Sequence, residues 1–495
     1  MEVIYLGVAL VFLCIVLLSR RSASNEAPGP GQLPLIGSLH HLTGQHPHHA
    51  MRDLARRHGP VMLLRLGEVP TLVVSSREAA REVMKTYDMA FATRPLRATV
   101  RVLTSGGRDI VFAPYGDYWR QLRRIAVLEL LSPRRVLSFR AIREEEVAAM
   151  LHDVAEAAAA ARPVELHEIL SVVVTNITVR AVMGDYRFKE RHVFLRALDR
   201  SQKLAAGFNP PDLWPSSRLV GCLSGALRRA RECRDTGNSI LDSIIRERLE
   251  RTTEVGGGQS NDQHMLDVLL SMHKEGSLDM DAVKNVIFDI FSAGSETTVL
   301  EWAIAELMKN PKVMQKATAE IRRSFEARGT VAEHALGELS YFHLVIRETL
   351  RLHTPTPLLL PRECREPCQV LGYDVPRGTQ VLVNAWALGR DEHYWPHAEE
   401  FRPERFEGEG EAATVDFRGN DFSFLPFGSG RRMCPGMAFG LANVELPLAS
   451  LLFHFDWEGP SPDDFDMTEV FGITARRKAD LQLRPVLRVP VPSRV

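Results

Sequence analysis

The alternation of apolar and polar positions predicts a chain made mostly of helices, with short strands towards both ends. Residues 61–76 (VMLLRLGEVPTLVVSS) hold two apolar runs separated by a Gly-to-Pro turn, which indicates a β-hairpin. From there to about residue 350, segments rich in Ala, Leu, Arg and Glu recur at helical spacing. Short strands return within residues 372–386 and 479–485. Because no internal repeat or domain boundary interrupts this pattern, we predict one large, mainly α-helical domain with a minor β portion.

The N-terminal segment has a different pattern from the rest of the chain. Residues 3–18 form an unbroken apolar run, followed by Ser19, Arg20 and Arg21. A cleaved signal peptide would carry positive charge before such a run, whereas the only early charge here is Glu2. The run is close to the length that spans a bilayer, and the arginines that follow it favour a cytosolic body. We therefore predict a membrane signal anchor over residues 1–20, a stiff proline-rich strap over residues 21–37 and a folded domain over residues 38–495.

Composition and charge exclude several other classes of protein. The chain has 61 basic and 62 acidic residues, so nothing indicates a nucleic-acid surface. Six cysteines among 495 residues fit a reducing compartment rather than a disulfide framework. Cys364 and Cys368 have C-x3-C spacing, but no second Cys or His pair accompanies them. Five histidines lie within residues 40–49, and we predict an exposed loop there because no regular element spaces them.

One stretch, residues 424–440 (FLPFGSGRRMCPGMAFG), places a cysteine among glycines and arginines. Cys434 lies just ahead of an apolar run that is long enough for a buried helix, where free N–H groups stabilise an anionic sulfur. The glycines allow a tight bend and let a flat group approach the backbone. Arg432 is placed to meet a carboxylate on that group. These neighbours suit a thiolate ligand of haem iron, while the alternative is a glycine-rich turn with an incidental core cysteine.

The fixed positions of this stretch resemble the haem-binding signature of the cytochrome P-450 family. They match the pattern F-G-x-G-x-R-x-C-x-G throughout. The resemblance implies a single cytochrome P-450 fold domain that binds haem b (iron protoporphyrin IX), with Cys434 as the metal ligand. The residues it assigns to the haem in this stretch are Phe427, Gly428, Arg432, Cys434 and Gly436.

The resemblance extends to residues that would hold the haem carboxylates. Trp119 and Arg123, in the segment WRQLRR, lie at i and i+4 on one predicted helical face. In the family these two positions contact the haem propionates. Arg362, in PLLLPRE, matches a further propionate-binding position.

Two shorter motifs imply a buried charge network. Glu348 and Arg351, in ETLR, are spaced to pair on one helix face, and Arg405 comes from the later segment PERF. By resemblance these three residues form a structural network that is not catalytic. Breaking such a network is expected to be costly.

The segment FSAGSETT, residues 291–298, is expected to cross the distal side of the haem. Ala293 and Gly294 are small and would open a groove for dioxygen and substrate. Ala293 and Thr297 are four residues apart, so we expect them to share one helical face. By resemblance, Glu296 and Thr297 are the acid–alcohol pair that relays protons.

The segment after Thr298 departs from the family pattern. In plant microsomal relatives four residues usually precede the following Glu-Trp, whereas here only Val299 and Leu300 do. Losing two residues rotates the rest of a helix by about 200°. A local bulge, a damaged distal helix and an imperfect sequence are the three alternatives.

Several segments look most like plant microsomal enzymes of specialised metabolism. That resemblance implies a monooxygenase inserting one atom of O2 into an apolar terpenoid, fatty or phenolic compound. Electrons would come from NADPH through NADPH–cytochrome reductase, with a cytochrome b-type protein as a second candidate donor. The expected location is the endoplasmic reticulum membrane, with one membrane pass and a cytosolic catalytic domain.

Two other functions remain as alternatives. One is a reductase-independent haem-thiolate isomerase or dehydratase, although such enzymes usually lack the acid–alcohol pair. The other is a membrane-anchored haem protein without turnover. The substrate is expected to contact five segments: residues 97–111, the surroundings of Phe208, and residues 286–293, 358–360 and 471–474.

Overall fold

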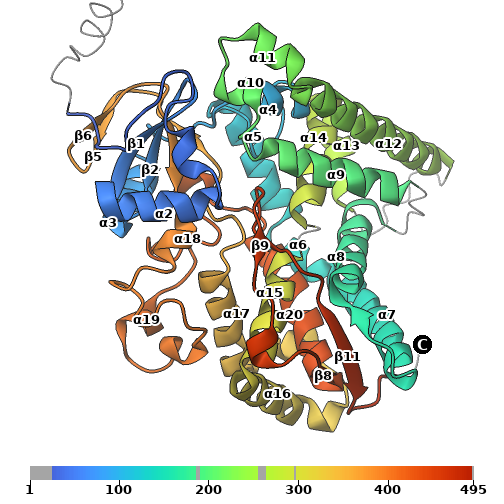
Figure 1. The fold of residues 1–495 in the computed structure, drawn as a ribbon. Helices are drawn as coiled ribbons and strands as arrows, with labels where there is room; N and C mark the ends of the chain where they lie inside the picture. The colour runs from blue at the N-terminus through green and yellow to red at the C-terminus, as the bar shows by residue number, and fades with distance from the viewer. Residues whose placement is uncertain (1–24, 185–189, 255–263, 295–296, 493–495) are drawn as a thin grey trace, which may run out of the picture.

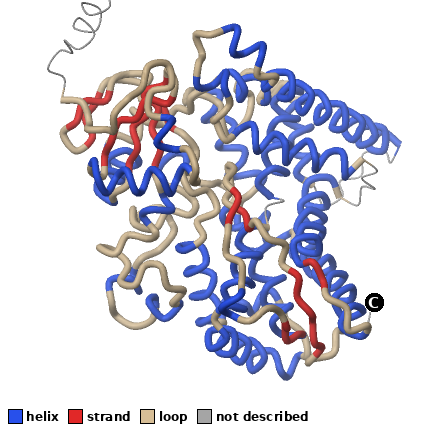
Figure 2. Tube along the Cα trace, in the orientation of Figure 1, coloured by secondary structure: helices blue, strands red, loops and turns tan. Residues whose placement is uncertain are grey.

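The computed structural model describes residues 25–184, 190–254, 264–294 and 297–492. Its helices form a large lobe, and a small sheet with its own short helices lies at the upper left of that lobe (Figure 1). The predicted anchor and Glu296 lie outside the described residues. Figure 2 shows how the strands are confined to the small lobe and to narrow ribbons within the helical lobe.

The predicted helical content is confirmed in the described part of the chain. The helices of the first half are α2 (Pro47–His58), α3 (Arg77–Arg81), α4 (Ala98–Leu103), α5 (Asp117–Ile125), α6 (Pro133–Ser138), α7 (Arg140–Ala159), α8 (Leu166–Met183), α9 (Arg191–Ala205), α10 (Pro210–Leu213), α11 (Arg218–Leu223) and α12 (Ala226–Glu254). Those of the second half are α13 (Met265–Lys274), α14 (Met280–Gly294), α15 (Thr298–Lys309), α16 (Pro311–Phe325), α17 (Ser340–Leu352), α18 (Ala385–Leu388), α19 (Glu411–Thr414) and α20 (Met437–His454).

The small lobe is built on a four-stranded sheet with the order β1-β2-β7-β4. The predicted hairpin is formed by β1 (Val61–Leu66) and β2 (Val69–Val74), and β2 pairs in parallel with β7 (Gln380–Val383). The antiparallel partner of β7 is β4 (Arg362–Glu363). The remaining strands are β3 (Val164–Glu165), β5 (Cys368–Val370), β6 (Tyr373–Val375), β8 (Phe455–Glu458), β9 (Glu469–Val470), β10 (Arg476–Arg477) and β11 (Gln482–Leu487). The strands predicted within residues 372–386 and 479–485 are therefore present.

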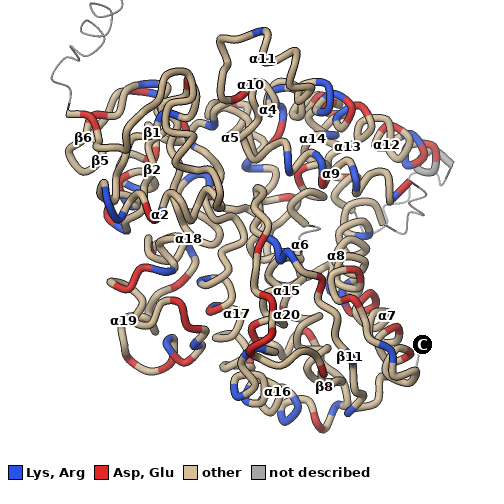
Figure 3. Tube along the Cα trace, viewed as in Figure 1, with Lys and Arg blue, Asp and Glu red and all other residues tan. Residues whose placement is uncertain are grey.

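The largest hydrophobic cluster lies in the helical lobe, and helices α7, α8, α14, α15, α17 and α20 contribute to it. Among the described residues, α8 and α20 are long and apolar enough to cross a membrane, but 61% and 67% of their residues are buried inside the fold. Such burial is that of core helices. Charged residues line the outer helices α7, α12 and α16 (Figure 3). This hydrophobic core holds the helices of the large lobe together.

The loop predicted over residues 40–49 is wrong. His40 and His41 lie in a short 3-10 turn, Leu39–Leu42, and α2 begins at Pro47. Pro is favoured at the first helical position because its missing N–H would have had no partner there. His48 is fully buried in that first helical turn. The start of α2 was not predicted because the segment around it is mostly polar.

Candidate active site

Cys434 lies between a short 3-10 turn, η7 (Gly430–Arg432), and the start of α20 at Met437. Its backbone N–H donates to the carbonyl of Phe427 at 3.0 Å. The backbone φ angles of Gly428 and Gly430 are +67° and +69°. A Cβ on Gly430 would lie 2.3 Å from the carbonyl oxygen of Met84, so only glycine fits there. The glycines therefore shape the loop that presents the sulfur.

Cys434 is exposed, although many protein atoms surround its thiol. Burial raises the pKa of the thiol, while the N–H of Gly436 and the charge of Arg123 act in the opposite direction. A bound metal ion reverses such a balance, because a coordinating thiol is deprotonated outright. The arrangement suits a sulfur that becomes a thiolate on binding a metal.

Several guanidinium groups gather in a buried cluster beside this loop: Arg94, Arg123, Arg362 and Arg432. Arg94, Arg362 and Arg432 are only 7%, 3% and 8% exposed. Burial lowers the pKa of Arg362 to about 10, and burial together with the charge of Arg362 lowers the pKa of Arg432 to about 9.

Few carboxylates of the described residues lie close enough to balance this positive charge. Asp88 lies 3.5 Å from Arg362. Burial raises the pKa of Asp109, which disfavours the charged form of that carboxyl group. An excess of buried positive charge calls for an anionic partner. The cluster therefore fits a flat group with two carboxylates, as the two propionates of haem are.

Trp119, on α5, is buried and tied to this cluster. Its indole N–H donates to the carbonyl of Ile110 at 3.1 Å, and the Arg432 guanidinium lies 4.1 Å from the centre of its ring. Arg432 also donates from Nε to the carbonyl of Ala92 at 2.7 Å. Trp119 thus holds Arg432 in place.

The distal segment is interrupted. Helix α14 ends at Gly294, and Thr297 is the N-cap of α15. Ala293 is exposed and Gly294 half-exposed, and the Thr178 hydroxyl donates to the Gly294 carbonyl at 2.9 Å. The expectation that Ala293 and Thr297 share a face of one continuous helix is therefore wrong. Helix α15 starts after Thr297, and residues 295–296 between the two helices lie outside the described part of the chain.

The hydroxyl of Thr297 is held by an acid that the sequence did not assign to the site. It donates to Glu301 Oε1 at 2.5 Å, and the same oxygen lies 2.7 Å from His167 Nδ1. Thr297 and Glu301 are 6% and 5% exposed, whereas the His167 side chain is 46% exposed. The three residues form a hydrogen-bonded chain from the surface to the break in the distal helix.

The electrostatics of this chain favour an ion pair. The hydrogen bond that His167 makes to the Glu301 carboxylate raises the pKa of His167. Burial alone would raise the pKa of Glu301, but its bonds to His167 and Thr297 outweigh burial and lower it. Beside the pair lies a polar cavity of about 230 Å³, lined among others by Gln202 and Arg476. This cavity gives water access to His167 and Glu301, which line it.

The predicted charge network is brought together in the structure. Glu348 accepts from Arg351 Nε at 2.7 Å and from Arg405 Nε at 2.9 Å, and Glu348 and Arg351 are fully buried. Arg351 also donates to the carbonyl of Ala398 at 2.7 Å. The network joins α17 to the 3-10 turn η6 (Pro403–Phe406) and the loop before it.

A small apolar cavity of about 40 Å³ lies between the lobes. It unites four of the five segments expected to contact substrate. Its lining includes Val100, Phe112, Phe208, Leu358 and Phe471. Residues 286–293 of α14 are the fifth segment and do not line this cavity.

Sequence reasoning missed Arg94, His167 and Glu301 as members of the site. Arg94 donates to the carbonyls of Leu360 and Pro361 at 2.5 and 3.0 Å. Arg94 and His167 meet their partners across more than 100 residues, so no spacing rule connects them to the motifs. Glu301 lies four residues after Thr297, a spacing that brings two side chains together on one helical face. The sequence signal for Glu301 was this four-residue spacing from Thr297.

Comparison with known proteins agrees with this geometry. The family model for Cytochrome P450 matches residues 27–482. The dolabradiene monooxygenase of Zea mays is 48% identical, with 98% of each chain covered. The desmethyl-deoxy-podophyllotoxin synthase of Sinopodophyllum hexandrum is 46% identical, over 97% of this chain and 96% of the relative. The premnaspirodiene oxygenase of Hyoscyamus muticus is 44% identical, over the same shares.

Solved structures show the same fold. A zebrafish cytochrome P450 determined with abiraterone superposes with a TM-score of 0.74 at 26% identity, over 89% of this chain and all of that one. A match over nearly the whole chain, together with relatives at 44–48% identity, is decisive for family membership. The chain belongs to the cytochrome P450 family and is a haem-dependent monooxygenase.

Proposed function

We propose that this monooxygenase inserts one oxygen atom of O2 into an apolar specialised metabolite, with terpenoid hydrocarbons as the first class to test. The relatives' names support this choice, since two of them refer to dienes. The mostly apolar lining of the cavity between the lobes suits the same class. The observation that carries the proposal is the exposed Cys434 beside a cluster of buried guanidinium groups.

The residues present divide into those that would hold the haem and those that would leave room above it. Cys434 would ligate the iron, and Arg123, Arg362 and Arg432 would meet the two carboxylates. Phe427, Gly428 and Gly436 would shape the loop under the haem, Trp119 would hold Arg432, and Ala293 and Gly294 would leave the distal side open. When bound, the haem supplies the oxygen chemistry, and the protein supplies binding, orientation and protons.

Thr297 and Glu301 are the described residues best placed to handle protons near the distal break. The Thr297 hydroxyl donates to Glu301, whose lowered pKa keeps it an acceptor at neutral pH. His167 links Glu301 to solvent. Glu296, the acid that the family resemblance pairs with Thr297, would be a second source of protons at the same break.

The expected electron donor is a membrane-bound NADPH–cytochrome reductase, with a cytochrome b-type protein as a second donor. The chain would be held in the endoplasmic reticulum membrane by residues 1–20, with its catalytic domain in the cytosol. The break in the distal helix also favours a second candidate, a haem protein without turnover. Product formation that depends on NADPH and reductase would support the first candidate, and its absence with every terpenoid tested would support the second.

Replacing Cys434 tests the proposed ligand. The purified Cys434→Ala protein is expected to lose the Soret maximum typical of the reduced, carbon monoxide-bound haem-thiolate form, because no thiolate remains to ligate the iron. Cys222→Ala, at an exposed cysteine on α11, is the control and should keep that maximum. A Cys434→Ala protein with an unchanged spectrum would rule out this cysteine as the ligand.

A further inference from the structure

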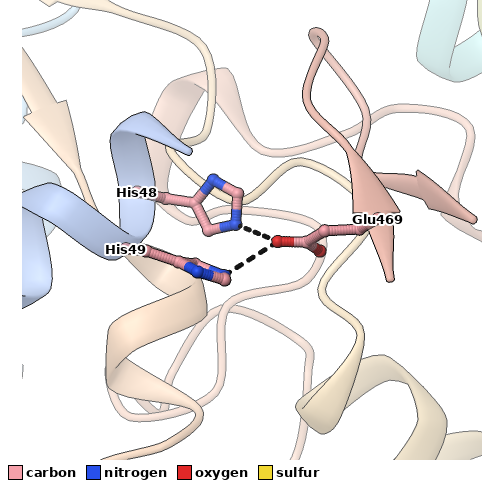
Figure 4. Close-up of side chains that lie close together, drawn as sticks. All are labelled: His48, His49 and Glu469. Atoms are coloured by element: carbon pink, nitrogen blue, oxygen red, sulfur yellow. Dashed lines mark hydrogen bonds and ion pairs between the residues drawn. The ribbon is translucent and has the colours of Figure 1, made fainter. Parts of the chain in front are cut away.

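A cluster of potential metal ligands lies outside the haem site, where α2 meets β9. His48 and His49 from the first turn of α2 converge on Glu469 at the start of β9 (Figure 4). One ligand atom from each residue lies within 4.8 Å of the other two. The Nε2 atoms of His48 and His49 are 2.7 and 2.8 Å from Glu469 Oε1.

The geometry at His49 is not that of a satisfied hydrogen bond. Its Nε2 is buried and close to Glu469 Oε1, but the N–H direction does not align with that oxygen, so the nitrogen has no hydrogen-bond partner. A cation ligated by all three atoms lies off the N–O lines, in the ring planes, about 2.0–2.2 Å from each ligand. The misalignment between His49 Nε2 and Glu469 Oε1 is therefore compatible with both atoms binding one cation.

The donor types also suit a metal, since the cluster offers two imidazoles and one carboxylate. Neutral imidazoles with one carboxylate are the donors that borderline divalent cations prefer.

The positive charge near the cluster is balanced by a carboxylate, and the cluster is partly accessible to solvent. Arg52 and Arg390 flank Trp386, and both pair with Glu399, at 3.6 and 3.1 Å. The His49 side chain is 30% exposed and that of Glu469 is 13% exposed. The ring of His49 stacks on Trp386 at 4.2 Å, which fixes its plane. The ligands are thus held in place but accessible.

We propose that His48, His49 and Glu469 form a binding site for a divalent cation of the zinc class, separate from the haem. The site joins two segments that lie 421 residues apart in sequence. The site is linked to the substrate cavity through one side chain. The centre of the His48 ring lies 5.6 Å from that of Phe471, and Phe471 lines the cavity. A bound cation would fix this wall of the cavity.

Calorimetric titration of zinc into the full-length holoenzyme, purified without a polyhistidine tag, tests the proposal. We expect one zinc equivalent per chain whose affinity falls at least about tenfold in His49→Gln and in Glu469→Gln. The matched control is His58→Gln, at the other end of α2, which should bind zinc as the wild type does. Weak binding at exposed thiols is common to all variants and cancels in the comparison.

His49→Gln is the decisive variant, because it removes one ligand and leaves the bond between His48 and Glu469 in place. Zinc should raise the unfolding temperature of the wild type and of His58→Gln but not that of His49→Gln. Equal zinc binding by the wild type and His49→Gln would overturn the proposal. So would a wild type that takes up no zinc, in which case the cluster is an ion pair that only joins α2 to β9.

Discussion

At the scale of single residues, the site depends on partners that the linear motifs do not name. The signature around Cys434 predicted where the cysteine and Arg432 would lie, because those neighbours are adjacent in sequence. Glu301, four residues after Thr297, accepts from its hydroxyl at 2.5 Å, a contact that i, i+4 spacing could have indicated. His167 joins them by a contact across 134 residues, which no linear motif predicts.

Replacing Thr297 by valine removes the hydroxyl and keeps the shape of the side chain. We expect a several-fold fall in product formed per NADPH consumed, because Glu301 loses its contact with the distal break. The free energy of unfolding should fall by about 1.5–3 kcal/mol, the usual worth of a hydrogen bond to a charged group. Product, peroxide and NADPH are counted in one reaction, with the adjacent Thr298→Val as control. Unchanged coupling would mean that Thr297 takes no part in proton delivery.

The ion pair between His167 and Glu301 predicts a pH-dependent stability. The pKa of His167 is raised above its usual value of 6.5, so its contribution is complete below that pH and is lost as pH rises through the raised value. The pKa of Glu301 is lowered below 4.5, so its contribution is complete above that pH and is lost as pH falls through the lowered value.

His167→Gln should therefore destabilise the protein most at about pH 6 and least at about pH 9. Thermal unfolding of wild type and variant at both pH values measures the difference. The exposed His393, which pairs with Asp391, serves as the control position. A destabilisation that is equal at the two pH values would show that His167 is neutral in the folded protein.

At the scale of secondary-structure elements, sequence patterns predicted whether a segment is a helix or a strand better than they predicted where each element begins and ends. The β1–β2 hairpin and the helix after Cys434 were predicted because apolar periodicity persists over several residues in each. The start of α2 was missed because histidines surround Pro47. The break between α14 and α15 was missed because apolar spacing alone does not show where backbone hydrogen bonds are lost.

The Glu348 network predicts a large effect of one arginine and a small effect of its neighbour. Arg405→Met leaves the fully buried Glu348 with less compensating charge, and we expect a loss of about 3–5 kcal/mol in the free energy of unfolding. Arg402→Met is the control, since that side chain is 50% exposed and lies 3.8 Å from Glu400, and it should cost less than about 0.5 kcal/mol. Denaturant unfolding measures both. A small effect of Arg405→Met would mean that Arg351 alone neutralises Glu348.

At the scale of the whole molecule, the segment that starts at Asn25 is bound to the small lobe. Its backbone N–H donates to Asp374 at 3.1 Å, and the carbonyl of Pro28 accepts from Leu63 at 2.8 Å. Ala27 is buried in the hydrophobic cluster of the small lobe. The strap is thus attached to the sheet before the helical lobe starts.

A chain that starts at Asn25 should keep its haem content and leave the membrane fraction to a large extent, because it lacks only the segment predicted as an anchor. A chain that starts at Leu33 should lose haem or stability, because it lacks Ala27 and Pro28. Haem absorbance per chain and the soluble fraction after centrifugation measure both effects. Loss of haem from the chain starting at Asn25 would show that the preceding residues belong to the fold.

The parallel pairing of β2 with β7 has a consequence for how the protein is made. Thr71–Val74 can find their partners Gln380–Val383 only after roughly 300 further residues have been synthesised. At translation rates of about 5–20 residues per second, the open edge of the hairpin waits roughly 15–60 s on the ribosome. An unpaired apolar strand edge is a template for association with other chains. Newly made chains are therefore most vulnerable to aggregation before the second half of the sheet emerges, and slowing translation within that interval should lower the yield of soluble protein.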